Sequence, residues 1–131
     1  VHVLNCSAYG QTGDPTVTKT HSGSGIILSS VSGGSITWSE AFDNGHLQAS
    51  HGGGPVGIWA WAASSITIAH CASWNNSCGS GQHDGGGFDL DGGVTNSVME
   101  YNLAFSNAGP GHMICEFEGG GAVICYLLLK Q

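Results

Sequence analysis

The chain contains no arginine and only two lysines, against nine acidic residues, in a total of 131 residues. Proteins bind nucleic acids through Lys and Arg side chains that neutralise phosphates and release counterions. Anionic membrane surfaces attract proteins through the same basic side chains. We therefore expect neither a nucleic-acid partner nor a membrane partner for this chain.

Long apolar runs and helical patterns are also lacking. No run of about 18 apolar residues could span a membrane, and no segment has the i, i+3, i+4, i+7 apolar spacing of an amphipathic helix. The five cysteines do not have the spacing of a zinc site. Two interpretations of them remain open. Cys6 and Cys71 could belong to a buried column of small residues, or Cys71 could form a disulfide with Cys78.

Repetition is what the chain has in abundance. A six-residue motif has a small residue third, an aromatic residue fourth and Asn or Gln last. Its copies are residues 6–11, 39–44, 71–76 and 102–107. The aromatic residues follow one another at intervals of 33, 32 and 31 residues. A fixed period in this range indicates repeats that stack and bury their apolar faces on one another.

Two further markers recur in phase with this motif. A glycine-led segment begins at Gly25, Gly57, Gly87 and Gly111, and a β-branched segment occupies residues 35–38, 65–68, 97–100 and 122–125. Such short strands of one period predict a solenoid of parallel strands. We expect one domain over residues 1–131. Its coils would cover about residues 1–11, 25–44, 57–76, 87–107 and 111–131, and its inserted loops residues 12–24, 45–56 and 77–86.

Successive coils of such a solenoid stack about 4.8 Å apart, so residues at equivalent positions of the coils form columns. The loops would cluster on one side, where inserted segments often form a binding surface. The expected columns are two apolar ones facing inward, one aromatic and one of amides. They are Ile26/Ile58/Phe88, Leu28/Ala60/Leu90, Tyr9/Phe42/Trp74/Phe105 and Gln11/Asn44/Asn76/Asn107.

The three repeated segments described above resemble those of the right-handed parallel β-helix proteins of the pectin-lyase-like superfamily. The resemblance covers nearly the whole chain. It implies an all-β fold, a right-handed parallel β-helix of about four coils. We expect both ends to be uncapped or truncated, and open coil ends favour a homo-oligomer because they present unpaired strand edges.

The densest group of polar residues lies in residues 83–93. Strand alternation places Asp89 and Asp91 on the outer face, and it places Trp59 and Trp61 at the same positions of the preceding coil. Indole rings offer a flat apolar surface to a sugar, and carboxylates accept hydrogen bonds from hydroxyl groups. Alternate residues of a strand lie about 7 Å apart, near the carboxylate separation of inverting glycosidases.

Neighbouring residues complete the candidate site. His83 and Asp84 precede the strand and are expected to bind substrate with the two tryptophans. In the next coil a direct count places Met113 and Cys115 beside the aspartates, and a slip of one residue would place Glu116 there instead. The candidate catalytic residues are therefore Asp89, Asp91 and Glu116.

Residues 87–107 also resemble the catalytic coil of mannuronan C5-epimerases and related alginate lyases. In that family a Gly-Phe-Asp-Pro-His phrase supplies an Asp and a His. Asp89 matches the Asp, whereas Leu90 and Asp91 replace the Pro and His. Glu116 would stand near the family's second acid. Because the chain has no arginine to neutralise a uronate, we expect a neutral or weakly charged glycan.

The sequence therefore predicts an extracellular or secreted protein that binds a polysaccharide or oligosaccharide and could cleave it, as a glycoside hydrolase would. The alternative is a non-catalytic structural or self-assembling β-helix segment. No cofactor is expected apart from a calcium ion, for which Asp84, Asp89 and Asp91 are the candidate ligands because calcium prefers oxygen donors.

Overall fold

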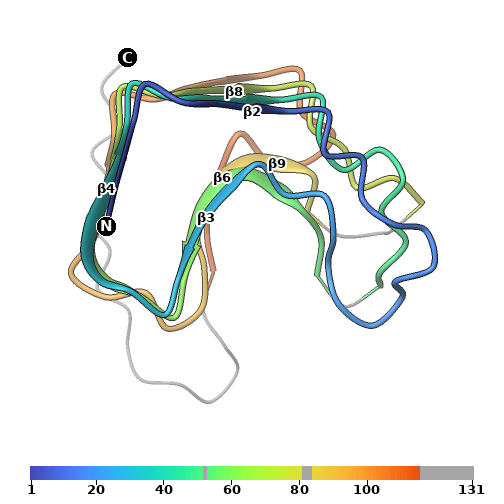
Figure 1. Cartoon of the computed structure of the whole chain (residues 1–131), viewed down its shortest axis with the longest axis horizontal. Coiled ribbons are helices and arrows are strands. Elements are labelled where there is room, and N and C mark those ends of the chain that lie inside the picture. The colour runs from blue at the N-terminus through green and yellow to red at the C-terminus, as the bar shows by residue number, and fades with distance from the viewer. Residues whose placement is uncertain (52, 81–83, 116–131) are drawn as a thin grey trace.

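The computed structural model describes residues 1–51, 53–80 and 84–115. Within these residues the fold is all-β, with twelve strands and only parallel pairing, and it forms a solenoid of about three turns (Figure 1). The predicted parallel solenoid is confirmed. The number of turns is below the predicted four, since most of the expected last coil lies in residues 116–131, outside the described residues. No apolar helix of membrane-spanning length occurs in the described part of the chain.

Three four-stranded sheets surround the core, and each coil contributes one strand to each sheet (Figure 1). Sheet 1 contains β1 (His2–Leu4), β4 (Ser32–Thr37), β7 (Ser64–Ala69) and β10 (Val98–Glu100). Sheet 2 contains β2 (Ser7–Tyr9), β5 (Glu40–Phe42), β8 (Ala72–Trp74) and β11 (Leu103–Phe105). Sheet 3 contains β3 (Ile26–Ser29), β6 (Val56–Trp61), β9 (Gly86–Leu90) and β12 (His112–Ile114).

The predicted columns agree with the register of the strands. Tyr9 pairs with Phe42, Phe42 with Trp74 and Trp74 with Phe105. The four rings stack with centroids 5.0, 4.4 and 5.5 Å apart and with nearly parallel planes. The two inward columns that contain Ile58 and Ala60 are likewise in register, and both belong to the buried apolar core.

The repeated glycine at the start of each sheet 3 strand has a steric cause. A Cβ atom added at Gly57 would lie 2.0 Å from Ser73 Oγ and 2.7 Å from Asn76 Nδ2. Gly25 and Gly87 meet Ala41 and Ala104 in the same way. Sheet 3 therefore approaches sheet 2 closely, which explains why the opening glycine and the small residue of the six-residue motif recur together.

The amide column is hydrogen-bonded along the solenoid, and its two inner members, Asn44 and Asn76, are buried. Asn44 Nδ2 donates to Asn76 Oδ1, and Asn76 Nδ2 donates to Asn107 Oδ1, both at 2.9 Å. The backbone N–H of Gln11 donates to Asn44 Oδ1 at 3.1 Å, and that of Asn76 donates to Asn107 Oδ1 at 3.0 Å. The amides also donate to backbone carbonyls, such as that of Ala8. The predicted amide column is confirmed, and its amides form hydrogen bonds between neighbouring coils.

The cysteines that the structure describes are free thiols, so the Cys71–Cys78 disulfide interpretation is wrong. Cys71 is buried beside Ser39, whereas Cys6, at the same position of the first coil, is exposed. The column of small residues therefore exists, but it is buried only inside the stack.

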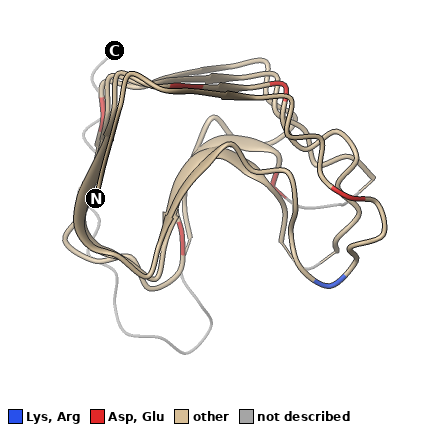
Figure 2. Ribbon diagram, viewed as in Figure 1, with Lys and Arg blue, Asp and Glu red and all other residues tan. Residues whose placement is uncertain are grey.

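The loops that follow sheet 2 project from one side of the solenoid (Figure 1). They are held to one another by backbone hydrogen bonds, from Leu47 N–H to Thr12 O at 2.7 Å and from Ser80 N–H to Gln48 O at 3.0 Å. Figure 2 shows Lys19 in one of these loops as the single basic residue among those described. The loops and the outer face of sheet 3 together form the walls of the candidate site.

Candidate functional site

A cavity of about 420 Å³ lies between the outer face of sheet 3 and the loops. It brings together four residues that the sequence singled out, Trp59, Trp61, Asp84 and Asp91. The other residues in its wall belong to two loops and are Lys19, Thr20, His21, Gly53 and Gly54. Residues from three coils therefore meet at one place.

Strand alternation explains why these side chains face the cavity. Phe88 and Leu90 of β9 are buried in the core between the sheets, so Asp89 and Asp91 point to the opposite face. Asp89 pairs in register with Trp59 of β6. The N–H of Asp91 continues the ladder by donating to the carbonyl of Ala60 at 2.9 Å.

Exposure differs from the prediction for two of these residues. Asp89 is only 2% exposed and Trp59 only 3%, although we expected both to point to solvent. The outer face is covered here because the loop of residues 12–24 returns over it, and the ring of His21 meets that of Trp59 edge to face at 5.0 Å. Trp61 is 38% exposed and Asp91 is partly exposed.

Asp89 is the most perturbed group of the site. Its pKa is raised to about 8, chiefly by burial and in addition by the charges of Asp91 and Asp84, against a smaller opposing effect of a hydrogen bond with Cys115. Its Oδ1 atom is buried and has no hydrogen-bond partner in the structure. Asp89 therefore holds a proton at neutral pH, as a general acid or a hydrogen-bond donor must.

The two aspartates lie closer together than the sequence indicated. One side-chain oxygen of Asp89, one of Asp91 and the Sγ atom of Cys115 all lie within 4.8 Å of one another. The expected distance of about 7 Å came from Cα spacing along a strand, whereas the side chains converge. This separation is nearer to the roughly 5–5.5 Å of retaining glycosidases than to the longer distance of inverting ones.

The coil after β9 is in the register of the direct count. Met113 pairs with Asp89, and the N–H of Cys115 donates to the carbonyl of Leu90 at 3.1 Å. The alternative slip of one residue is therefore wrong, and Cys115 lies beside Asp91. Glu116 and His83, which the sequence proposed as catalytic and substrate-binding residues, lie outside the described residues.

The donor atoms near Asp89 fit calcium only in part. Calcium takes about six to eight oxygen ligands, and the cluster contains two carboxylates and a thiol, Asp84 not being a member. The pKa of Cys115 is raised to about 11 by burial and by the nearby carboxylates, which keeps the thiol protonated. The calcium site stays a prediction.

Sequence reasoning missed the residues that close the cavity, His21 and Lys19. Both lie in a loop without repeat partners, and the only signal for them was the expected clustering of the loops. It also missed that the Nε1 atom of Trp59 is buried without a hydrogen-bond partner. This donor and Asp89 Oδ1 belong to residues that pair in register.

A second groove, of about 480 Å³, lies at the corner between sheets 1 and 2. Its wall includes a second aromatic ladder that sequence reasoning missed, Trp38–His70–Tyr101, with rings stacked 4.5 and 5.2 Å apart. Intervals of 32 and 31 residues could have revealed it. The one carboxylate in its wall, Glu40, accepts a hydrogen bond from Ser7 at 2.7 Å.

No family model matches this chain, and neither a curated protein nor a solved structure is significantly similar to it.

Proposed function

We propose that this protein binds a polysaccharide or oligosaccharide in the cavity over sheet 3. One observation carries the proposal: two tryptophans and two aspartates from separate segments line a single cavity of about 420 Å³. Trp61 keeps enough exposed ring to contact the apolar face of a pyranose. Asp84 and Asp91 are acceptors for sugar hydroxyls.

The two unpaired buried atoms also suit a sugar. Trp59 Nε1 needs an acceptor, and Asp89 Oδ1 needs an acceptor when it carries the proton and a donor when it does not. A hydroxyl group is both at once, and buried polar groups without partners are costly enough that a ligand or water is expected to satisfy them. A ligand rich in hydroxyl groups matches this requirement better than an apolar one.

The test is titration calorimetry of the full chain against neutral and weakly charged glycans. We expect Trp61→Ala to weaken binding at least about tenfold, because aromatic stacking contributes on the order of 1.5 kcal/mol beyond area burial. Trp38→Ala is the matched control, since Trp38 is 62% exposed and lies in the other groove. The proposal fails if no glycan binds or if both variants behave alike.

Cleavage of the glycan is a second candidate function, favoured by the acid pair. Asp89 is protonated at neutral pH, and Asp91 lies within 4.8 Å of it in the cavity wall. In this role Asp89 protonates the leaving oxygen while Asp91 attacks the anomeric carbon and forms a covalent glycosyl ester. Water, activated by the deprotonated Asp89, then cleaves this ester, which frees Asp91 and gives net retention of configuration. Asp89→Asn and Asp91→Asn should each abolish the release of reducing ends. Hydrolysis that survives Asp89→Asn would remove the catalytic role and leave the binding role.

The phrases shared with the pectin-lyase-like superfamily and the mannuronan C5-epimerases support a polysaccharide-active ancestry and a secreted or extracellular location. Epimerase or lyase chemistry fits less well. Leu90 and Asp91 occupy the places of the Pro and His, and the chain contains no arginine to neutralise a uronate carboxylate.

A further inference from the structure

The carboxylates of the cavity are held in fixed positions. Asp84 Oδ2 accepts a hydrogen bond from the N–H of Gly54 at 2.7 Å, and Asp91 Oδ1 accepts one from the N–H of Gly92 at 2.6 Å. The carboxyl group of Asp89 is buried and does not itself line the cavity, but one of its oxygens lies within 4.8 Å of an oxygen of Asp91. The cavity thus carries acidic groups whose geometry is set by the backbone before any ligand arrives.

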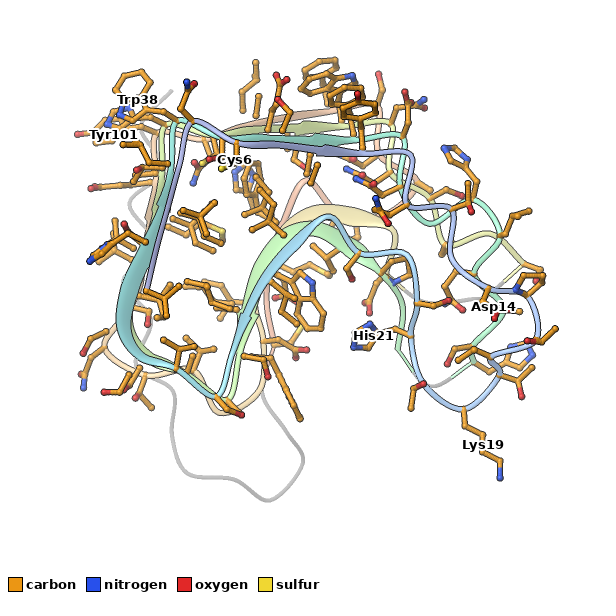
Figure 3. All side chains as sticks on the ribbon, in the orientation of Figure 1. Cys6, Asp14, Lys19, His21, Trp38 and Tyr101 are labelled. Carbon is orange, nitrogen blue, oxygen red and sulfur yellow. The ribbon has the colours of Figure 1, made fainter. Side chains whose placement is uncertain are left out.

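Positive charge near these groups is sparse. Lys19 belongs to the cavity wall and is the single lysine among the described residues. Figure 3 shows its side chain at the loop tip, pointing away from the sheets, while His21 lies nearer to them. The carboxylates of Asp84 and Asp91 in the cavity wall would attract a cationic group of a ligand.

The two buried atoms without hydrogen-bond partners limit which kinds of cation could bind in the cavity. Trp59 Nε1 requires an acceptor, and Asp89 Oδ1 requires an acceptor when it carries the proton and a donor when it does not. Both side chains are more than nine-tenths buried. A bare metal ion satisfies the carboxylate and offers no lone pair to the indole N–H. An ammonium group next to a hydroxyl group supplies a positive charge, several donors and an acceptor within one ligand.

We propose that the glycan bound here contains amino sugars whose amino group is free and protonated. The ammonium group lies between Asp84 and Asp91, and the adjacent hydroxyl group pairs with Trp59 Nε1 and Asp89 Oδ1. This inference rests on the proposed function, because it assumes that a glycan occupies the cavity. It goes beyond that function by assigning the glycan a positive charge, whereas the sequence alone indicated a neutral or weakly charged glycan.

The experiment compares three oligosaccharides that differ only at carbon 2 of each sugar, which carries a hydroxyl, an acetamido or an ammonium group. Glucose-type and galactose-type series are both titrated into the full chain by calorimetry at low salt. We expect the ammonium member of one series to bind at least about tenfold tighter than its two relatives, since a charge-assisted hydrogen bond is roughly twice as strong as a neutral one.

Two variants show whether the cavity carboxylates cause this preference. Asp84→Asn should remove most of the advantage of the ammonium ligand over the hydroxyl ligand, measured in each chain as the ratio of the two dissociation constants. Glu40→Gln is the matched control, because it removes a carboxylate of the other groove. The ammonium preference should persist in that variant.

The outcomes separate the two proposals. Equal affinity for the three members of a series would overturn this inference and leave carbohydrate binding intact. No binding of any oligosaccharide would remove the proposed function and this inference together. Stoichiometric binding of Zn²⁺ or Ca²⁺ that blocks the ammonium ligand and is lost in Asp89→Asn would identify the cavity as a metal site, which also overturns the inference.

Discussion

Asp89 combines an outward position on its strand with almost complete burial. Alternation along β9 turns it away from the core, but loop residues and the next coil cover it. A carboxyl group in this position is neutral at the pH where other aspartates are ionised, because burial and two nearby carboxylates oppose its charge. The burial of Asp89 by the loops and the next coil therefore determines its protonation state.

Stability should depend on pH through this residue. In the folded chain Asp89 has a pKa of about 8, against an ordinary value of 3.8. Between these values the folded state holds a proton that the unfolded state has released, so rising pH favours unfolding. The free energy of unfolding should fall by up to about 1.4 kcal/mol per pH unit over this window.

Urea unfolding of the parent chain and of Asp89→Asn, measured from pH 4 to pH 9, tests this dependence. The asparagine cannot ionise, so the difference in stability should grow in favour of the variant up to about pH 8 and then level off. Other titrating groups are common to both chains and cancel in the difference. Parallel curves across the whole range would contradict the assigned protonation of Asp89.

The amide column gives a second residue-level prediction. Asn76→Ala removes the acceptor of two N–H groups of Asn44 and the donor to Asn107. Buried groups left without partners cost about 1–3 kcal/mol each, so we expect a loss of about 3 kcal/mol in the free energy of unfolding. Asn75→Gly is the control, because Asn75 is exposed and has a left-handed backbone that glycine also adopts. If both variants lost a similar free energy of unfolding, the buried amide column would contribute no more to stability than an exposed asparagine.

The strands of sheet 2 are only three residues long. Such short elements have little stability alone, and they persist here because each strand of an inner coil hydrogen-bonds to a neighbour on both sides. The close approach of sheet 3 to sheet 2 adds the contacts across the core. Glycine at the start of the sheet 3 strands permits that approach.

We expect Gly57→Ala to destabilise the chain strongly. The new Cβ would lie 2.0 Å from Ser73 Oγ and 2.9 Å from the carbonyl of Gly87, so β6 must move away from sheet 2. Overpacking of this kind costs about 3 kcal/mol or more. In Gly111→Ala the nearest atom, Ala104 Cβ, is at 3.2 Å, and the loss should be much smaller. Thermal or urea unfolding of both variants measures the difference, and equal losses would disprove the steric explanation.

At the scale of the whole molecule, the solenoid places residues about thirty positions apart in the chain next to one another. The cavity exists because loops from successive coils project from the same side as the outer face of sheet 3 (Figure 1). No single coil contains both a tryptophan and an aspartate of the cavity wall. Binding therefore requires the coils to remain stacked.

Association of the 131-residue chain is a prediction at the same scale. β1, β2 and β3 each pair on one side only, and the ring of Tyr9, at the end of its ladder, is 60% exposed. Unpaired edges favour contact with another copy. We expect the mass measured by light scattering to rise with concentration, and Tyr9→Lys to reduce the rise. Leu47→Lys, an exposed loop position, should have no effect. A constant mass at all concentrations would argue against association and against the self-assembling alternative.

The regular part of the structure was predictable from residues such as Phe42, Trp74 and Asn76. Their positions recur with one period, and side chains at equivalent positions of stacked coils must face one another. A direct count along the chain even placed Cys115 correctly beside Asp91. The second ladder, which includes His70, follows the same period and could have been found in the same way.

The chemistry of the site was predictable only in part. The sequence placed Trp59 and Asp89 on one face, but it indicated an exposed pair and a wider separation of the aspartates. The covering loop of residues 12–24 has no counterpart at the same length in the other coils, so no pattern shows where His21 lies. Side-chain convergence likewise cannot be derived from the spacing of a strand.

The sequence by itself determined the stack of parallel coils, because a periodic pattern of small, aromatic and amide residues is satisfied only when equivalent positions meet. Only the tertiary structure decided that Asp89 is buried and protonated and that a cavity forms beside it. Desolvation and electrostatic repulsion depend on how β9, β12 and the loops come together in space, and no local pattern encodes those distances.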